Sequence, residues 1–350
     1  MRRTPDRRFV ISTLAAGLAA CGRAGAPRTK RSGPFDAARV SKAFPAIGAR
    51  AGSGVFAAGL MNPADTQSWF FRGEQAFPMA GLAALPTAAA ALAEVDAGRL
   101  KLGERITITE MDLSAPYSAI DQAWPTPPSP HAALMPAIDL ISLALQADDN
   151  TAADAVMKRL GGPGAVTAWL RQVGLKEMRV DRYAREVAQN ISGMEPFRPQ
   201  WKDEAAWIAA RDTVPAAGRE TAMNAYLADP RDTTTVRAAV QLLYLLSLGE
   251  LLSAASTRLL LTLMATSRTG ANRLAAGLPA GAALAQKAAS TRTDLGLTPA
   301  VNDVGIVTFK NGRRIIMAGF LAGSTATQAQ RDRLFAEAAR LFTRSLGEAD

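Results

Sequence analysis

The stretch Phe77-Pro78-Met79-Ala80-Gly81-Leu82-Ala83-Ala84 begins the segment around which the rest of the chain is organised. It leads into an alanine- and leucine-rich run that reaches Gly98, and this composition predicts an apolar helix. The chain has 350 residues, of which 48% are hydrophobic. It is therefore long enough to bury such a helix in a sizeable core, as one large domain or two interleaved lobes.

Strands are predicted on both sides of this helix, near the two ends of the chain. Residues 54–61 and 67–71 have the pattern of two strands joined by the turn Asn62-Pro63-Ala64-Asp65. Residues 304–309 and 313–321 flank Asn311-Gly312, which is a strong signal for a tight hairpin. Residues 327–346 carry the apolar stripe of a last helix. The sequence therefore predicts an α/β (α+β) fold whose sheet is assembled from both chain ends.

Three further motifs follow in order along the chain. They are Asp148-Asp149-Asn150-Thr151-Ala152-Ala153, Arg231-Asp232-Thr233-Thr234-Thr235 and Lys287-Ala288-Ala289-Ser290. Together with the opening stretch they resemble the class A β-lactamases, which carry Ser-x-x-Lys, Ser-Asp-Asn and Lys-Thr-Gly motifs. The resemblance extends from about residue 40 to residue 345. It implies a β-lactamase/transpeptidase-like fold, in which an antiparallel sheet flanked by helices is joined to an all-helical lobe.

The same resemblance indicates that the catalytic residues of the family are missing. Gly81 stands where the family has its nucleophilic serine, and Ala84 stands where it has the lysine of the first motif. Asp148 replaces the serine of the second motif, and Ala184 replaces the glutamate that activates the deacylating water. Acyl transfer needs a nucleophile with a nearby base, so no intact catalytic residue is predicted.

The resemblance also assigns residues to a ligand-binding cleft and to a structural ion pair. The cleft residues are Tyr117, Asp148, Asn150, Lys287 and Ser290, with Tyr117 as an aromatic wall or, equally, as a half-exposed loop residue. Asp148 and Lys287 are expected within about 4 Å of each other, the separation of an ion pair. Arg182 and Asp232 are expected to pair and so to brace the two ends of the Ω-loop region.

Between that pair of residues the chain is about three times longer than in the family. This enlarged region, residues 183–231, contains Phe197, Trp201, Trp207 and Tyr226. Loops of this length are uncommon without a function. Two alternatives remain open: a structural flap that buries its own tryptophans, or a surface that covers the cleft or contacts a partner.

The N-terminus resembles a lipoprotein signal. Residues 1–21 have a basic start, a short apolar stretch and the lipobox-like end Leu18-Ala19-Ala20-Cys21, which implies lipidation of Cys21. Residues 22–38 are predicted to be a flexible linker, and residues 39–347 are predicted to be the folded domain. The expected location is the periplasm, with a membrane anchor; Gly22 after the cysteine weakly favours the outer membrane over the inner one.

The charge distribution argues against nucleic acid as a partner. The formal net charge is +9, but residues 1–33 hold eight lysines or arginines against one aspartate. The rest of the chain is therefore close to neutral. No residue cluster has metal-ligand spacing and no phosphate-binding glycine loop is present, so no cofactor or metal is expected.

These observations predict a pseudoenzyme of the class A β-lactamase fold, with a non-catalytic binding or scaffolding role at the cell wall. Its partner is expected to be a cell-wall peptide, or a periplasmic protein that contacts residues 183–231. The alternative is an active or altered serine-type hydrolase, either a β-lactamase or a D,D-peptidase, with an unrecognised nucleophile.

Overall fold

The computed structural model describes residues 35–122, 132–201 and 203–347. Cys21, the predicted signal segment and most of the predicted linker lie outside the described residues. None of the described helices is both long enough and apolar enough to cross a membrane.

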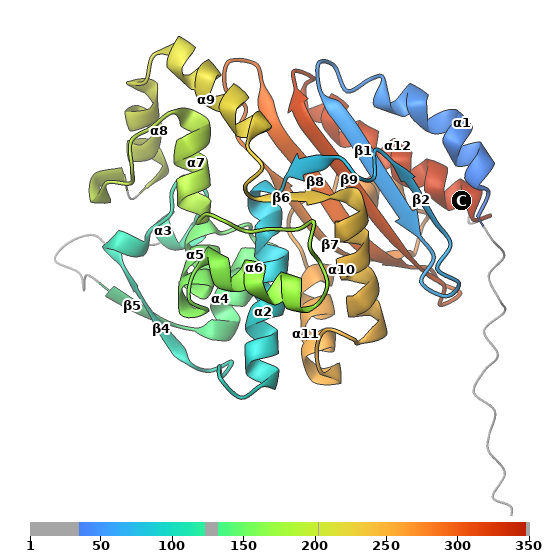
Figure 1. Ribbon diagram of the computed structural model, residues 1–350, viewed down its shortest axis with the longest axis horizontal. Helices are drawn as coiled ribbons and strands as arrows, with labels where there is room; N and C mark the ends of the chain where they lie inside the picture. Colours follow the sequence, from blue (N-terminus) through green and yellow to red (C-terminus); the bar gives the residue numbers. More distant parts are fainter. Residues whose placement is uncertain (1–34, 123–131, 202, 348–350) are drawn as a thin grey trace, which may run out of the picture. The chain divides into compact units, whose positions relative to one another are not determined.

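A five-stranded antiparallel sheet forms the centre of the fold, in the order β2-β1-β9-β8-β7 (Figure 1). Its strands are β1 (Val55–Met61), β2 (Ser68–Phe71), β7 (Ala283–Ser290), β8 (Thr298–Thr308) and β9 (Arg314–Ser324). β1 pairs with β9 along its whole length, so the first and last strands of the chain lie side by side. This pairing confirms that both chain ends build the sheet. The tight turn between β8 and β9 contains Gly312 at φ +81°, a conformation that glycine adopts readily.

Two helices cover one face of the sheet, namely α1 (Ala37–Gly48) and α12 (Gln328–Ser345). Phe44 of α1 stacks on Phe342 of α12, with ring centroids 6.0 Å apart. Phe35 is also buried in this layer, although residues 22–38 are predicted from the sequence to be a linker. The linker prediction is wrong for residues 35–38, because Phe35 is buried in the core and α1 begins at Ala37.

The other face of the sheet carries a helical lobe, in which α2 (Ala84–Asp96) is the central helix (Figure 1). Every residue of α2 from Ala84 to Leu92 is buried. A helix that is apolar on all sides must be surrounded by protein, which confirms the expectation from its sequence. Its neighbours are α4 (Ala137–Gln146), α5 (Asn150–Arg159), α6 (Pro163–Gln172) and α11 (Ala254–Ala265), while α10 (Val236–Leu248) packs against β1 and β9.

The remaining described elements are 3₁₀ helices, α-helices and two strand pairs. They are the 3₁₀ helices Ala80–Ala83, Glu110–Asp112, Pro199–Trp201 and Leu274–Gly277, the helices α3 (Ala119–Gln122), α7 (Ala184–Ser192), α8 (Glu204–Asp212) and α9 (Ala216–Ala228), and the strand pairs β3 (Ala76–Pro78) with β6 (Thr233–Thr235) and β4 (Arg105–Thr109) with β5 (Ala132–Pro136). Trp207, of the enlarged region 183–231, lies on α8.

Among the described residues, both hydrophobic cores, one on each face of the sheet, are built between residues 35 and 346. Residues 33–350 also form a compact unit of their own. This unit therefore contains the packing that stabilises the fold, and it is expected to fold without the first 32 residues.

Candidate functional site

The cleft lies between strand β7 and the helical lobe, where the 3₁₀ helix Ala80–Ala83 leads into α2. Gly81 is on this turn, at the position that the sequence assigns to the missing nucleophile. A Cβ atom added to Gly81 would lie 2.5 Å from Asp148 Oδ1, whereas real Cβ atoms do not come within about 3.0 Å of other atoms. The carboxylate of Asp148 therefore occupies the space in which a serine side chain at residue 81 would begin.

Leu82 and Leu85 are both buried in the core on the lobe side of the sheet. The chain before Asp148 and after it is helical, but Asp148 itself has φ +57°. The left-handed conformation is uncommon for residues other than glycine, and aspartate is among those that tolerate it best.

Asp148 also pairs with Lys287 of β7. Lys287 Nζ lies 2.6 Å from Asp148 Oδ1 and donates a second hydrogen bond, of 3.0 Å, to the Ala144 carbonyl. The two residues that the sequence expects within about 4 Å of each other are thus in direct contact. The Lys287 side chain has no exposed surface. The sequence assigns Lys287 to the ligand-binding cleft, but in the structure its charge is used within the protein and is not presented to a ligand.

Ala184 is the first residue of α7 and its side chain lines the cleft. Its backbone N–H donates to Asp154 Oδ1 at 2.6 Å, and Ser114 Oγ donates to Asp154 Oδ2 at 2.8 Å. Burial raises the pKa of the Asp154 carboxyl to about 6. Glu186, two residues further on, accepts from the Tyr183 N–H at 2.8 Å and so caps the same helix. The first turn of α7 therefore lies where the resemblance to the family predicts a water-activating carboxylate.

The base of residues 183–231 is braced by Arg182 and Asp232. Arg182 Nε lies 2.6 Å from Asp232 Oδ2, and both side chains are buried. Asp232 also accepts from the backbone N–H groups of Asp181 and Arg182, at 2.6 and 3.1 Å. Arg182 makes a further ion pair of 3.2 Å with Asp229. The structure therefore brings together the two residues that the sequence pairs.

Helix α8, in the middle of residues 183–231, lies at the cleft. Glu204, the first residue of α8, forms an ion pair with Arg292 in the segment that follows β7. The Arg292 guanidinium lies over the Tyr117 ring, 5.6 Å from its centroid. Trp207, one turn along α8, is 2% exposed and lines the cleft. Arg219 of α9 adds a 2.8 Å ion pair with Asp294. Residues 183–231 thus cover part of the cleft and bury Trp207, whereas Trp201 is partly exposed.

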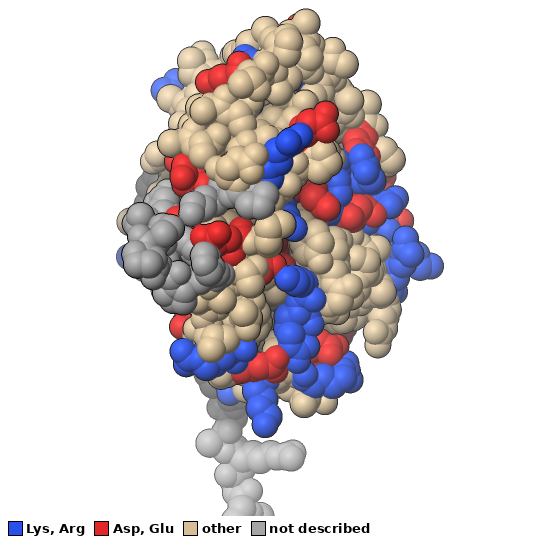
Figure 2. Space-filling model, turned by 90° about the vertical axis from the view of Figure 1, so that its left-hand side faces the viewer, with Lys and Arg blue, Asp and Glu red and all other residues tan. Residues whose placement is uncertain are grey.

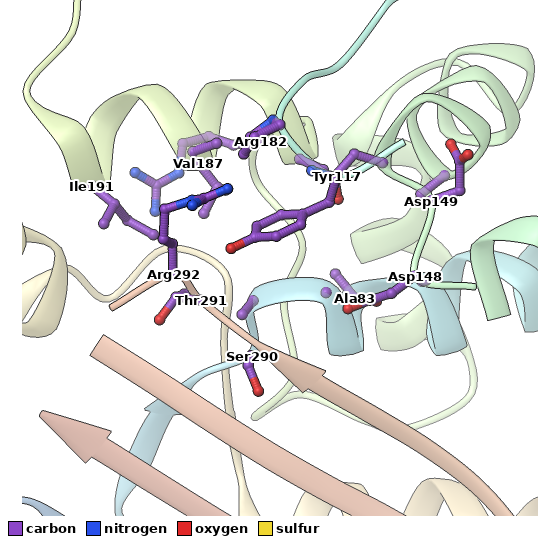
Figure 3. A pocket seen from close by; sticks show the side chains of 18 of the residues that line it. Ala83, Tyr117, Asp148, Asp149, Arg182, Val187, Ile191, Ser290, Thr291 and Arg292 are labelled. Carbon is purple, nitrogen blue, oxygen red and sulfur yellow. The ribbon is translucent and has the colours of Figure 1, made fainter. Parts of the chain in front are cut away.

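This cover divides the cleft into two parts. One is a narrow cavity of about 80 Å³, lined by Gly81, Ala84, Asn150 and Ala184 among others. The other is an open groove of about 620 Å³ between β7 and the first turn of α12. Tyr117, Asp148 and Ser290 border both parts. Figure 3 shows the Tyr117 ring across the pocket, between Arg292 and Asp148. Tyr117 is 38% exposed, so it is both a wall of the cleft and a half-exposed residue.

Four residues of this site are not identified from the sequence: Glu204, Arg273, Arg292 and Asp154. Arg273 donates to Ser290 Oγ and to the Ala289 carbonyl, and it pairs with Asp332 of α12 at 2.9 Å. Their contacts join segments 16 to 88 residues apart. The one local signal is the position of Arg292, two residues after the third motif. Among the described ranges, no group of three or more His, Cys, Asp or Glu side chains is placed to hold a metal ion.

Comparison with known proteins agrees with this geometry. Residues 39–346 match the family described as the Beta-lactamase enzyme family. The Toho-1 β-lactamase of Escherichia coli is 27% identical over 284 residues, which cover 81% of each chain. A β-lactamase of Streptomyces albus G is 30% identical over 281 residues, or 79% of this chain and 75% of the relative.

Solved structures give the same result. The class A β-lactamase of the last common ancestor of Gram-negative bacteria aligns with a TM-score of 0.69 and 30% identity, over 87% of this chain and 98% of that one. A β-lactamase from Chitinophaga pinensis aligns with a TM-score of 0.71 and 26% identity, over 87% and 98%. The chain therefore belongs to the β-lactamase enzyme family and has the fold of its class A members.

Proposed function

We propose that this protein is a non-hydrolytic member of the family, a pseudoenzyme with a binding or scaffolding role at the cell wall. The observation that supports this most directly is the Asp148 carboxylate in the space of a residue-81 side chain. A β-lactam is opened by a nucleophile whose proton a nearby base removes, and the acyl group is released by an activated water. Gly81, Ala84 and Ala184 supply none of these groups.

Two hydroxyl groups at the cleft, those of Ser290 and Thr291, do not replace the missing nucleophile. Ser290 Oγ accepts a hydrogen bond from Arg273, which is always charged and cannot take up a proton. Thr291 Oγ1 contacts the backbone carbonyl of Ala300 at 3.2 Å. A hydroxyl without a basic partner is a weak nucleophile at neutral pH.

The open groove is the part of the cleft that suits a ligand. Its volume of about 620 Å³ is within the range of small-molecule sites. Arg292 borders this groove and is engaged by Glu204, a carboxylate of the protein itself. A cell-wall peptide carboxylate would have to displace Glu204 to reach that charge. Binding of β-lactams is therefore expected to be too weak to detect at ordinary concentrations.

The lipid anchor at Cys21, the periplasmic location and a protein partner for residues 183–231 are also part of this proposal. They are supported by the lipobox-like sequence and by the length of residues 183–231. Replacement Cys21→Ser is expected to move the protein from the membrane fraction to the soluble periplasmic fraction. An unchanged distribution would contradict the anchor.

The test of the proposal is covalent labelling by a fluorescent penicillin, together with nitrocefin turnover. The full chain is compared with an active relative such as the Streptomyces albus G enzyme. We expect no labelled band and no turnover above buffer for this chain. A band that resists denaturation and disappears on preincubation with unlabelled penicillin would support the alternative, a hydrolase with an unrecognised nucleophile.

A binding measurement tests the remaining half of the proposal. Calorimetric titration with soluble cell-wall peptides is expected to give saturable binding that Glu204→Gln strengthens, because the internal competitor for Arg292 is weakened. Glu220→Gln, in the exposed part of α9, is the matched control and is expected to leave binding unchanged. No binding by the wild-type chain and by Glu204→Gln would contradict a cell-wall peptide as the ligand.

A further inference from the structure

Residues of α1 and α12 line a groove. Both helices lie on the sheet face opposite the helical lobe (Figure 1). The groove has a volume of about 410 Å³. Four arginines and one glutamate make up its charged lining: Arg39, Arg50, Arg340, Arg344 and Glu337. Ile47, Leu341 and two alanines make up the apolar part. A surface that combines guanidinium groups with apolar side chains suits an anion that carries an apolar body, because guanidinium binds phosphate through paired hydrogen bonds.

Three of the four arginines form no ion pair with a described residue, although the Asp36 carboxylate lies beside Arg39 and accepts its backbone N–H at 2.9 Å. Arg50 pairs with Glu337, the one acid of the groove. Arg340 donates one hydrogen bond, of 3.0 Å, to the Ala276 carbonyl, which leaves most of its five N–H donors for other acceptors. The Arg39 and Arg344 side chains are exposed and contact no acceptor among the residues that the structure describes.

Some basic residues of the helical lobe form ion pairs with acidic residues. Arg99 pairs with Glu94 at 2.6 Å, and Arg159 pairs with Glu104 at 2.5 Å. Figure 2 shows the face of the molecule that includes α8, where lysines and arginines alternate with acidic residues. Other arginines of the lobe, such as Arg171 and Arg258, are exposed and form no ion pair with a described residue. The α1–α12 groove differs in that four arginines line one groove with a single glutamate.

The groove is held in shape by the core beneath it. Val40, Phe44 and Ile47 of α1 pack with Phe335 and Phe342 of α12 in one buried cluster. Arg39, Arg340 and Arg344 thus project from two packed helices, and Arg50 follows the end of α1 by two residues. Little ordering of the backbone is therefore needed when an anion binds.

The position of the groove points to a membrane as the source of the anion. Asp36, just before α1, donates its backbone N–H to the Ser345 carbonyl at 2.9 Å, next to Arg344. The chain that connects the fold to Cys21 therefore starts beside the groove. The 13 residues 22–34 span at most about 45 Å when fully extended, which is close to the diameter expected for a domain of this size.

We propose that this groove docks the domain on an anionic membrane surface by binding the phosphate groups of phospholipid head groups. The proposal shares with the proposed function only the location at a membrane, and it does not depend on what the cleft binds. The first turn of α12 borders the open groove of the cleft, and Arg344 lies about 20 Å further along the same helix. Docking through Arg344 would therefore direct the cleft away from the lipid.

The test is binding of residues 33–350, which lack Cys21 and the signal segment, to vesicles. Phosphatidylcholine vesicles with and without about one third phosphatidylglycerol are compared by flotation, at low and at physiological salt. We expect binding to the anionic vesicles only, weakening steeply with salt. Each arginine near such a surface contributes about five-fold to the affinity. Replacing Arg340 and Arg344 by Gln should therefore lower the affinity about 25-fold, and Glu337→Gln should raise it about five-fold.

The matched control replaces Arg171 and Arg258 by Gln, which makes the same change in net charge on the helical lobe, where both side chains are exposed. It is expected to bind as the wild type does. An equal loss in both double variants would show that only net charge matters and would overturn the site. No binding to anionic vesicles at low salt would overturn the membrane. The membrane would also be overturned if the protein bound insoluble cell wall through Arg340 and Arg344 but did not bind vesicles. None of these outcomes changes the penicillin-labelling result, so the two proposals fail separately.

Discussion

The contact between Gly81 and Asp148 can be tested by placing a side chain where the structure leaves no room for one. Gly81→Ser adds a Cβ atom 2.5 Å from Asp148 Oδ1, and 3.1 Å from the carboxyl carbon and the other oxygen. The backbone of Gly81 does not have a positive φ, so serine is not excluded by conformation. The cost therefore arises from the carboxylate, which has to move.

The size of this cost follows from what Asp148 holds in place. Its Oδ1 atom lies 2.6 Å from the ammonium of Lys287, whose side chain is fully buried. Breaking a buried ion pair by disturbing one partner costs about 3–5 kcal/mol. Asp148 is 25% exposed, so water compensates part of the loss. We expect Gly81→Ser to lower the free energy of unfolding by about 2–4 kcal/mol. Asp148→Ser should cost a similar amount, because it removes the charge beside Lys287.

The double variant separates this account from ordinary packing effects. Without the carboxylate, a serine at residue 81 no longer meets an obstacle. The double variant should therefore be about as stable as Asp148→Ser alone, which gives a coupling energy of about 2–4 kcal/mol in a double-mutant cycle. Gly103→Ser is the control, since a Cβ atom there meets no atom within 4 Å. It should change stability by less than about 0.5 kcal/mol.

Urea unfolding of the four proteins of the cycle measures these energies from the midpoints and slopes. Additive effects of the two substitutions would refute the reasoning, because they would mean that Asp148 does not occupy the space beside Gly81. A stable Gly81→Ser variant would refute it as well.

Three further predictions follow from the same structure. Replacing Gly81 by Ser and Ala84 by Lys should not give multiple turnover of nitrocefin, since Ala184 still lacks a carboxylate; sustained turnover would reveal another base. Arg182→Lys should lower the free energy of unfolding by about 1–3 kcal/mol, because lysine cannot contact both partners of the brace, and it should increase proteolysis within residues 183–231; equal proteolysis of both proteins would contradict this. Burial raises the pKa of Asp303 to about 7, so the folded state binds a proton that the unfolded state releases near pH 4. This contribution to stability is present below about pH 4 and is lost as the pH rises toward 7. Asp303→Asn should therefore flatten the stability profile between about pH 4 and pH 7, and parallel profiles in urea would contradict the assignment.

The sequence predicts the framework of this protein well because the framework depends on local patterns. The apolar run after Phe77 becomes the buried helix α2, and Asn311-Gly312 becomes the turn between two paired strands. The motif register also places Asp148 beside Lys287 and Arg182 beside Asp232, as the structure has them. These residues belong to sequence motifs of the family or lie next to them, so the register of the motifs is enough to pair them.

The cover of the cleft could not be predicted in the same way. Glu204 and Arg292 are 88 residues apart, and neither belongs to a motif. The position of the Asp148 carboxylate is also not visible in the sequence, because it depends on a left-handed backbone conformation at that residue. The sequence predicts a domain start at residue 39, which is too late. Phe35 is a single apolar residue in a polar segment, and its burial depends on helices α1 and α12.

The residues that replace the catalytic groups of the family fit one another. Restoring a serine at Gly81 alone, or a glutamate at Ala184 alone, is therefore expected to destabilise the protein. At Ala184, a glutamate would introduce a second carboxylate next to Asp154, which accepts from the Ala184 and Arg185 N–H groups. Asp154 is already hard to ionise, because burial raises its pKa to about 6. A neighbouring negative charge would raise that pKa further and weaken the two hydrogen bonds that hold the start of α7. The start of α7 is thus more stable with Ala184 than with the glutamate that hydrolysis would require at this residue.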